Sequence, residues 1–216
     1  QRTPGGDRYY HLTACAADDT GYHNLMALST RAYTEGYWYK PRIDRELLAE
    51  HSDGLIVLSG CLGGEVNQHL LQGDEAGAKA ALAEFRDILT PERFFVELMD
   101  HGIPEQSRTW PVLERLAKDL GLRTVITNDS HYTSAADAEA HDALLCIQTG
   151  SRMSDEKRFR LSPAGQYYVR SAEEMWRKFG SVAPDALRAT LDIAEMASAT
   201  LDFGLDLLPA FPCPDG

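Results

Sequence analysis

Two side chains that could bind a metal ion follow an apolar, β-branched run near the middle of the chain. Asp129 and His131 stand two positions apart, shortly after Val125-Ile126. In an extended segment the side chains at i and i+2 point the same way, so a carboxylate and an imidazole would leave the end of a buried strand together. Such oxygen and nitrogen ligands suit Zn²⁺, Mn²⁺ and related ions. The alternative is an ordinary turn with a capping Asp and a hydrogen-bonded His.

The elements that must position these residues alternate along the chain. Strands are predicted at 9–16, 54–59, 94–98 and around 125–126. Helices are predicted at 21–33, 45–51, 65–71, 75–89, 106–120, 136–147, 172–179 and 184–199. This alternation predicts an α/β fold with a parallel sheet or barrel. Ligands of such folds collect at the carboxyl ends of the strands.

Other candidate ligands stand near the ends of predicted strands. Cys61 follows the second strand, and its thiolate together with imidazole would favour zinc or a similar ion. His11 falls inside the first predicted strand, from which it could point into a barrel mouth. The alternatives are that Cys61 is a small buried apolar residue and that His11 is a hydrogen-bonded core histidine. Asp100 and His101 follow the third strand, where a site and a capped turn are both open readings.

Two further patterns each allow a functional and a structural interpretation. The glycines at 60, 63 and 64 precede a predicted helix and could cradle a phosphate, but they lack the spacing and lysine of a phosphate loop, so we expect a tight turn. Segment 37–42 contains Tyr39, Lys40 and Arg42, which could contact single-stranded nucleic acid or pack as a loop. A smaller basic patch, Lys157, Arg158 and Arg160, is open to the same two readings.

Composition and charge narrow the function classes. The formal net charge is −12, from 21 basic and 33 acidic residues, which argues against binding driven mainly by phosphate neutralisation. A nuclease stays possible, because bound metal ions supply local positive charge. No apolar run reaches 18 residues, so no membrane span is predicted. Four cysteines without a C-x-x-C pair, and no secretory features, predict a reducing, cytoplasmic compartment.

Several blocks, in order and covering nearly the whole chain, resemble one family. They are Tyr10-His11-Leu12-Thr13, GYWYKPRI (36–43), Ser59-Gly60-Cys61, ELMDHG (97–102), TNDSHY (127–132) and AEAHDALLCIQTG (138–150). They closely resemble the PHP (polymerase and histidinol phosphatase) domain of the alpha subunit of bacterial DNA polymerase III. On this basis residues 1–8 are a loop, 9–204 form most of the PHP domain, and 205–216 form a linker toward a polymerase palm.

The resemblance implies a distorted seven-stranded βα barrel with up to three zinc or manganese ions at its rim. It implies that His11, Cys61, Asp129 and His131 are metal ligands, with Asp129 and His131 central to phosphoester hydrolysis. The activity attributed to some family members is 3′→5′ exonucleolytic proofreading. We place Glu97, Asp100, His101 and His141 in a supporting shell around this site. His141 could pair with Asp137, four positions earlier on the predicted helix.

The sequence departs from the family pattern at both ends. The family's His-x-His motif, its Thr-Asp-His-Gly motif and a Glu ligand would precede His11, and none is in this sequence. The aspartates of the Mg²⁺-dependent polymerase site would follow Gly216. We therefore expect a window of a larger protein, with an incomplete barrel and no catalysis by this piece alone.

The function that the resemblance implies is DNA synthesis by a replicative polymerase, with primer-template DNA as substrate. The implied partners are the rest of the polymerase chain, a sliding clamp, other replisome subunits and a proofreading exonuclease, with no membrane. One alternative is a non-catalytic scaffold that metal ions brace and that docks a separate exonuclease. Another is a stand-alone PHP phosphoesterase.

Overall fold

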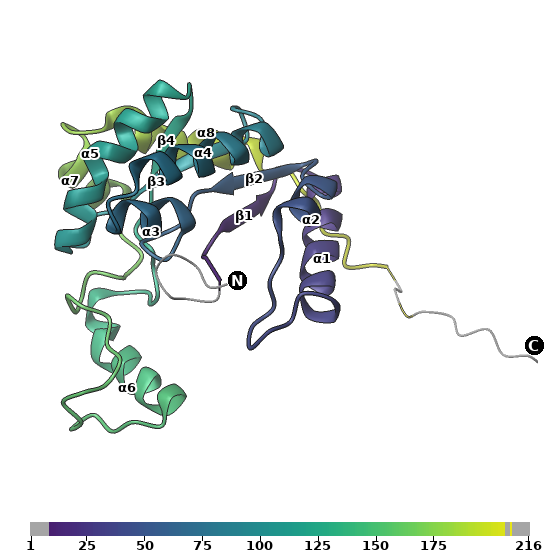
Figure 1. Ribbon diagram of the computed structural model, residues 1–216. Coiled ribbons are helices and arrows are strands. Elements are labelled where there is room, and N and C mark those ends of the chain that lie inside the picture. The colour runs from purple at the N-terminus through teal and green to yellow at the C-terminus, as the bar shows by residue number, and fades with distance from the viewer. Residues whose placement is uncertain (1–8, 206–207, 209–216) are drawn as a thin grey trace, which may run out of the picture.

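A four-stranded sheet flanked by helices forms the body of the protein (Figure 1). The computed structural model describes residues 9–205 and 208. The strands are β1 (Thr13–Ala16), β2 (Leu55–Leu58), β3 (Phe94–Leu98) and β4 (Arg123–Ile126). The helices are α1 (Asp19–Thr34), α2 (Arg45–Glu50), α3 (Glu65–Leu71), α4 (Glu75–Leu89), α5 (Pro104–Asp119), α6 (Ala138–Thr149), α7 (Ala172–Phe179) and α8 (Pro184–Met196), with a 3₁₀ turn, η1 (Ala135–Asp137), before α6.

The sheet is mixed, which corrects the prediction of a purely parallel one. Its order is β1-β2-β3-β4; β2, β3 and β4 are parallel, whereas β1 is antiparallel to β2. The register pairs Thr13 with Leu58, so β1 begins at the edge where β2 ends. Among the described residues the strands form this single sheet, and the seven-stranded barrel stays a prediction. The predicted loop 1–8 and most of the predicted linker 205–216 lie outside the described residues.

Side-chain alternation along the strands creates two apolar layers. Val57, Phe94 and Val96 pack with α4 and α5 in the larger core cluster. Ile56, Phe95 and Val125 pack on the opposite face, where α8 contributes Ala189. In Figure 1, α4 and α5 lie in front of the sheet and α8 behind it, while α1 and α2 stand beside β1. Burying both faces explains why β2 is a continuous apolar run and why β3 is apolar except for Glu97.

Most helix boundaries follow from local capping chemistry. Asp44 accepts a hydrogen bond from the Leu47 N–H at 2.9 Å and caps α2, as its sequence position predicts. Helix α1 begins earlier than predicted, because Asp18 rather than Thr20 is the N-cap and accepts from the Gly21 N–H at 2.9 Å. Asp18 is therefore a capping residue and not merely a solvated turn residue.

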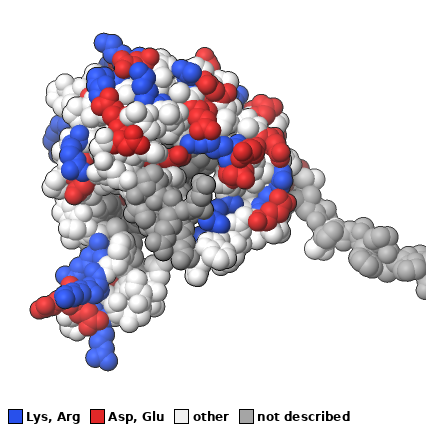
Figure 2. All heavy atoms as spheres, viewed as in Figure 1, with Lys and Arg blue, Asp and Glu red and all other residues white. Residues whose placement is uncertain are grey.

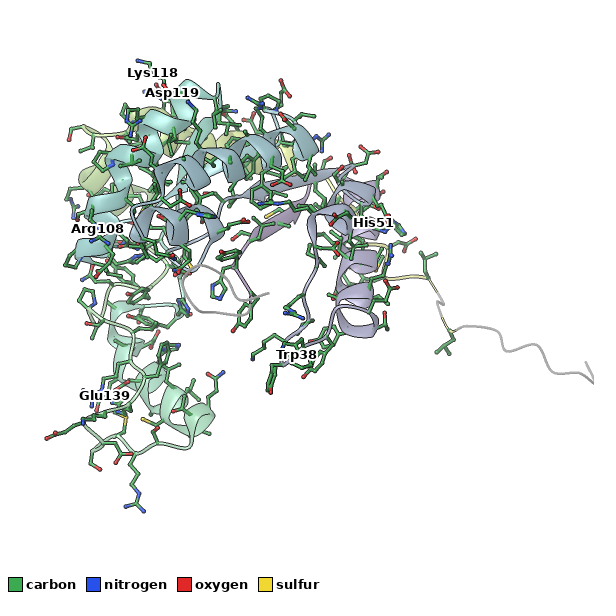
Figure 3. The ribbon with its side chains drawn as sticks, in the orientation of Figure 1. Trp38, His51, Arg108, Lys118, Asp119 and Glu139 are labelled. Carbon is green, nitrogen blue, oxygen red and sulfur yellow. The ribbon has the colours of Figure 1, made fainter. Side chains whose placement is uncertain are left out.

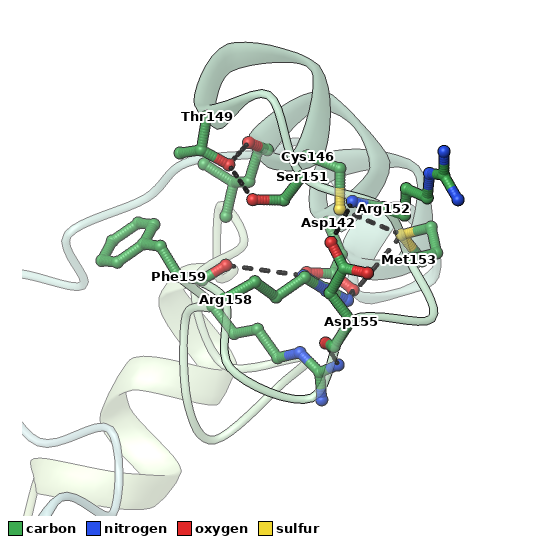
Figure 4. Close-up of polar contacts among 11 residues, drawn as sticks. Asp142, Cys146, Thr149, Ser151, Arg152, Met153, Asp155, Arg158 and Phe159 are labelled. Carbon is green, nitrogen blue, oxygen red and sulfur yellow. Dashed lines mark hydrogen bonds and ion pairs between the residues drawn. The ribbon is translucent and has the colours of Figure 1, made fainter.

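A helical arm carrying α6 projects from the sheet (Figure 1). Arg158 and Asp142 hold the loop after α6 against that helix through a two-pronged ion pair at 2.5 Å (Figure 4). The Arg158 side chain is only 2% exposed, so this member of the predicted basic patch has a structural role. Tyr132 and Tyr168 form an isolated parallel bridge outside the sheet. Within the part of the chain that the structure describes, no helix is long and apolar enough to cross a membrane.

Replacing one core leucine tests this packing. Leu82 of α4 is fully buried in the larger core cluster, so Leu82→Ala should lower the free energy of unfolding by about 2–5 kcal/mol. The measurement is urea unfolding of the chain followed by circular dichroism. Leu191→Ala is the matched control, because Leu191 of α8 is 64% exposed and its truncation should change stability by less than about 0.5 kcal/mol. Equal losses in the two variants would contradict the assigned core.

A candidate metal-binding site at the ends of the strands

A cavity of about 570 Å³ opens at the edge of the sheet where the parallel strands end. Three residues of ligand type from distant parts of the sequence line it: His11, Cys61 and Asp129. Glu97 of β3 and Thr127, just after β4, also line it. Cys61 and Asp129, which follow two of the parallel strands, thus line one cavity at the edge where ligands of such folds collect.

His11 reaches the cavity by a route that the sequence does not suggest. It lies before β1 rather than inside a strand, which corrects the prediction. Because β1 runs antiparallel to β2, the start of β1 and the end of β2 lie at the same edge. The His11 imidazole Nδ1 is 3.5 Å from the Cys61 thiol. His11, which precedes β1, therefore lies beside Cys61, which follows β2.

The glycines around Cys61 let two backbone segments approach closely. The His11 N–H donates to the Gly63 carbonyl at 3.0 Å. Gly60 has a φ of +86°, and a Cβ there would stand 2.6 Å from the His11 carbonyl oxygen. A Cβ at Gly64 would stand 2.5 Å from the Ser59 carbonyl oxygen. The glycines are thus explained by close backbone packing, as the predicted tight turn requires, without a phosphate.

The buried Glu97 carboxyl group connects the ends of three strands. One oxygen accepts the Gly60 N–H at 3.0 Å and the other accepts the Thr127 hydroxyl at 2.7 Å. The Glu97 N–H donates in turn to the Ser59 hydroxyl at 2.9 Å. Burial raises the pKa of Glu97, and the negative charge of Asp129 raises it further, although the two accepted hydrogen bonds oppose this. Glu97 thus fixes the floor of the cavity.

Burial also raises the pKa of the Cys61 thiol. The nearby charges of Asp129 and Glu97 add to this effect, while a hydrogen bond with Gly63 opposes it. Without a bound cation, the thiol form is therefore favoured over the thiolate that a metal would need. A divalent ion in this cavity would reverse that balance, because its charge favours the thiolate.

Asp129 and His131 do not leave an extended strand, contrary to the prediction. Strand β4 ends at Ile126, and Asp129 has a φ of +43°, so the i, i+2 rule for extended chain does not apply. Asp129 lines the cavity, whereas the His131 ring lies edge-on to Tyr167 and His141, at centroid distances of 5.7 and 5.8 Å. The His131 Nδ1–H donates to the Asp129 carbonyl at 2.6 Å. The side chain of His131 is exposed.

A buried histidine supports the turn that carries Asp129. His101 is 2% exposed and stacks on Tyr167 at a centroid distance of 4.5 Å. Its Nε2–H donates to the Asn128 carbonyl at 2.7 Å, and its Nδ1 accepts from the Gln106 amide at 2.9 Å. This pattern assigns the neutral tautomer protonated at Nε2. Of the two open readings for His101, support of the candidate site fits these contacts.

The other two residues placed in the supporting shell make local contacts. Asp100 accepts from the Gly102 N–H at 2.8 Å and pairs with Lys178 at 3.2 Å, which is the geometry of a closed turn. His141 packs against Tyr132 and His131. The suggested partner of His141, Asp137, instead accepts from the backbone N–H and hydroxyl of Ser134. Asp137 therefore closes the turn before α6.

The segment with Tyr39, Lys40 and Arg42 lies beside a second cavity of about 690 Å³. Arg42 lines this cavity, and Tyr10 and Leu12 line both cavities. Tyr10 and Leu12 thus form part of the wall of each cavity. Figure 2 shows acidic and basic side chains interspersed over the visible face of the helices, so no single-sign field marks this face.

The donor types at the first cavity suit a divalent ion, since thiolate, imidazole and carboxylate are all zinc ligands. The arrangement is incomplete, however. Among residues 9–205 and 208, no group of three His, Cys, Asp or Glu side chains is close enough to hold an ion. The described part of the chain thus has the His11–Cys61 pair, with Asp129 in the same cavity, but not a full coordination shell.

Sequence reasoning missed the residues that hold this arrangement in place. Asn128 donates its amide N–H to the Tyr168 carbonyl at 2.7 Å. Gln106 accepts from the backbone N–H of His101 and donates to Nδ1 of the His101 ring. Thr127 binds Glu97. A polar residue just after an apolar strand, or a Gln near a helix start, is too common to single these residues out from sequence.

Comparison with known proteins identifies relatives of the chain. Residues 2–101 match the PHP domain family. The chain is 45% identical over 212 residues to a DNA polymerase III subunit alpha of Deinococcus radiodurans, covering 96% of this chain and 16% of the relative. The Thermus aquaticus subunit is 44% identical over 217 residues, covering 96% and 17%. That of Treponema pallidum is 41% identical over 209 residues, covering 97% and 18%. The chain thus spans about a sixth of the length of these relatives.

The buried carboxyl group gives a pH-dependent prediction. The pKa of Glu97 is raised above its ordinary value of 4.5 in the folded protein, so the folded state holds this proton to a higher pH than the unfolded chain does. Its contribution to stability is complete below 4.5 and is lost as pH rises through the raised value. Glu97→Gln cannot ionise, so its unfolding free energy should decline less between pH 5 and pH 8 than that of the wild type.

Urea unfolding across this pH range in EDTA measures the effect. Glu105→Gln is the control, because Glu105 lies exposed on α5 and its replacement should keep the wild-type slope. Parallel pH profiles for Glu97→Gln and the wild type would contradict a strained, buried Glu97.

Proposed function

The chain contains a PHP domain and is homologous over 96% of its length to the PHP region of DNA polymerase III alpha subunits, and on that premise we propose that it serves as this region of a bacterial replicative DNA polymerase. We propose further that its rim cavity contributes part of a metal-dependent phosphoesterase site. In the whole protein, that site removes nucleotides from the 3′ end of DNA.

One observation carries the proposed site. His11, Cys61 and Asp129 come from three separate segments and line a single cavity. Packing alone does not require a thiol, an imidazole and a carboxylate from three segments to meet there, because none of the three residues belongs to the buried core. In this proposal His131 joins them as a fourth ligand after its ring turns from Tyr167 and His141.

Donors from elsewhere in the whole protein complete the coordination shell in this proposal. This part of the proposal rests on two facts: the described residues lack a three-donor group, and the chain spans about a sixth of its relatives. The ions that suit these donors are zinc or manganese. When bound, they would lower the pKa of a coordinated water and stabilise charge on a scissile phosphate.

The chain's own residues have distinct tasks in this proposal. Glu97 holds the exits of β2 and β4 at a fixed separation through Gly60 and Thr127. His101 holds the Asn128 carbonyl, and thereby the turn that presents Asp129. These contacts position ligands, and they do not themselves touch the substrate.

A second candidate function is a metal-braced scaffold without catalysis. The closed hydrogen-bond network under the cavity favours it, because these contacts hold the strand ends in place without a substrate. In that case the metal would stabilise the fold, and a separate exonuclease would proofread. Primer-template DNA, the rest of the polymerase chain and other replisome subunits are the proposed partners in either case.

Substitution of one proposed ligand separates these functions. In the full-length protein, Asp129→Asn should lower metal-dependent 3′→5′ excision by at least about 100-fold, because it removes a charged donor. DNA synthesis on a primed template should be unchanged. The measurements are excision of a labelled single-stranded primer with Mn²⁺ or Zn²⁺, without any partner exonuclease, and bound metal by mass spectrometry.

Asp185→Asn is the matched control, since Asp185 is exposed on α8, far along the chain from the cavity residues. It should change neither excision nor metal content. Unchanged excision by Asp129→Asn would overturn the catalytic assignment. A wild-type protein without excision activity, whose metal content and melting temperature fall in Asp129→Asn, would instead establish the scaffold.

A further inference from the structure

A loop of consecutive aromatic residues stands at the edge of the second cavity. We call residues 36–43 the aromatic loop. Tyr37, Trp38 and Tyr39 are 57%, 53% and 67% exposed. Other large rings of this protein, such as Phe94 and Phe95, are fully buried. Aromatic side chains are usually buried, so three consecutive exposed rings indicate an interaction site.

The backbone of the loop holds these rings outward. The Trp38 N–H donates to the Lys40 carbonyl at 3.0 Å, which closes a tight turn around Tyr39. Tyr39 has a φ of +62°, which is uncommon for a bulky residue. Tyr37 stacks on Tyr33 of α1 at 6.3 Å, and this anchors the loop to the body. In Figure 3, Trp38 lies at the far end of the loop, away from the sheet.

The chemistry of the loop matches unpaired bases. Aromatic faces stack on bases of any sequence, and cations nearby hold the phosphates between them. Lys40 is exposed at the tip, and Arg42 lines the adjoining cavity. Bases within a duplex are already stacked on one another, so rings of this kind select single strands. Because the net charge of the chain is −12, we expect stacking rather than phosphate neutralisation to supply most of the affinity for single-stranded DNA.

The position of the loop connects it to the candidate site. Tyr10 and Leu12 line both the cavity beside the aromatic loop and the cavity that contains His11 and Cys61. The two cavities thus share part of their walls, which places the aromatic loop near those ligands.

We propose that the aromatic loop is a binding platform for single-stranded DNA, whose unpaired bases stack on Trp38 and Tyr39 while Lys40 and Arg42 contact the backbone. The delivery of a 3′ end to the His11 cavity rests on the proposed function, whereas the binding itself does not. With two cations, the logarithm of the affinity should fall with the logarithm of salt concentration at a slope of about −1.4 at most.

Photochemical cross-linking tests the platform in the full-length protein. A single-stranded oligonucleotide containing 5-iodouracil is irradiated with the protein in EDTA, and the modified residues are mapped by mass spectrometry. We expect adducts on residues 37–39, and a smaller yield with the same sequence as a duplex. Trp38→Ala should weaken binding of the same oligonucleotide, measured by filter binding in EDTA, by about 5- to 150-fold, the range for stacking on one ring.

Two variants control for folding and for nonspecific reaction. Trp176→Ala removes another partly exposed ring, on α7, and should leave the adducts at the loop unchanged. Trp38→Phe keeps a ring and should retain most of the binding. If Trp38→Phe loses it as fully as Trp38→Ala, with both variants folded by circular dichroism, the stacking platform is overturned.

Two other outcomes would also overturn the proposal. One is adducts confined to residues outside the aromatic loop. The other is protection of Trp38 from oxidative footprinting in the absence of DNA, which would show that a protein surface covers the loop. The cross-linking is done without metal, so it does not depend on excision. If the wild type forms the loop adducts but shows no metal-dependent excision, the proposed exonuclease is contradicted and the platform is supported.

Discussion

A single buried carboxyl group determines how the strand ends are arranged. Glu97 accepts hydrogen bonds from Gly60 and Thr127, which follow β2 and β4, while its own N–H binds Ser59. Leaving any of these buried polar groups without a partner costs about 1–3 kcal/mol. The three strand exits are therefore held at fixed separations, and the residues that follow them inherit that geometry. Cys61 and Asp129 are positioned by this constraint.

The direction of β1 is the second determinant of the cavity. An antiparallel edge strand places its beginning, and with it His11, beside the ends of the parallel strands. The His11 backbone then packs on the glycine turn around Cys61, where a Cβ at Gly60 or Gly64 would collide. Thiol and imidazole consequently meet at 3.5 Å although they are fifty positions apart in the chain. The same glycines that allow this contact would otherwise look like a phosphate loop.

Homology and geometry support different parts of the functional interpretation. The similarity to DNA polymerase III alpha subunits assigns the region of a larger protein to which the chain corresponds. The cavity shows which of its residues meet. A divalent ion would change the protonation state of the site. The raised pKa of Cys61 keeps its thiol protonated, and a bound cation would favour the thiolate. Metal binding and proton release by this cavity are therefore coupled in the proposed site.

Local patterns in the sequence predict the four strands, most of the helices and the sheet edge at which candidate ligands follow the strands. Apolar runs such as Leu55–Leu58 and caps such as Asp44 depend on neighbouring residues, through local periodicity and local hydrogen bonds. Contacts made in the folded chain set the antiparallel direction of β1, the turn at Asp129, and the anchoring of the strand ends by His101 and Glu97. These features depend on contacts between residues tens of positions apart and on one left-handed φ, and no local pattern encodes either.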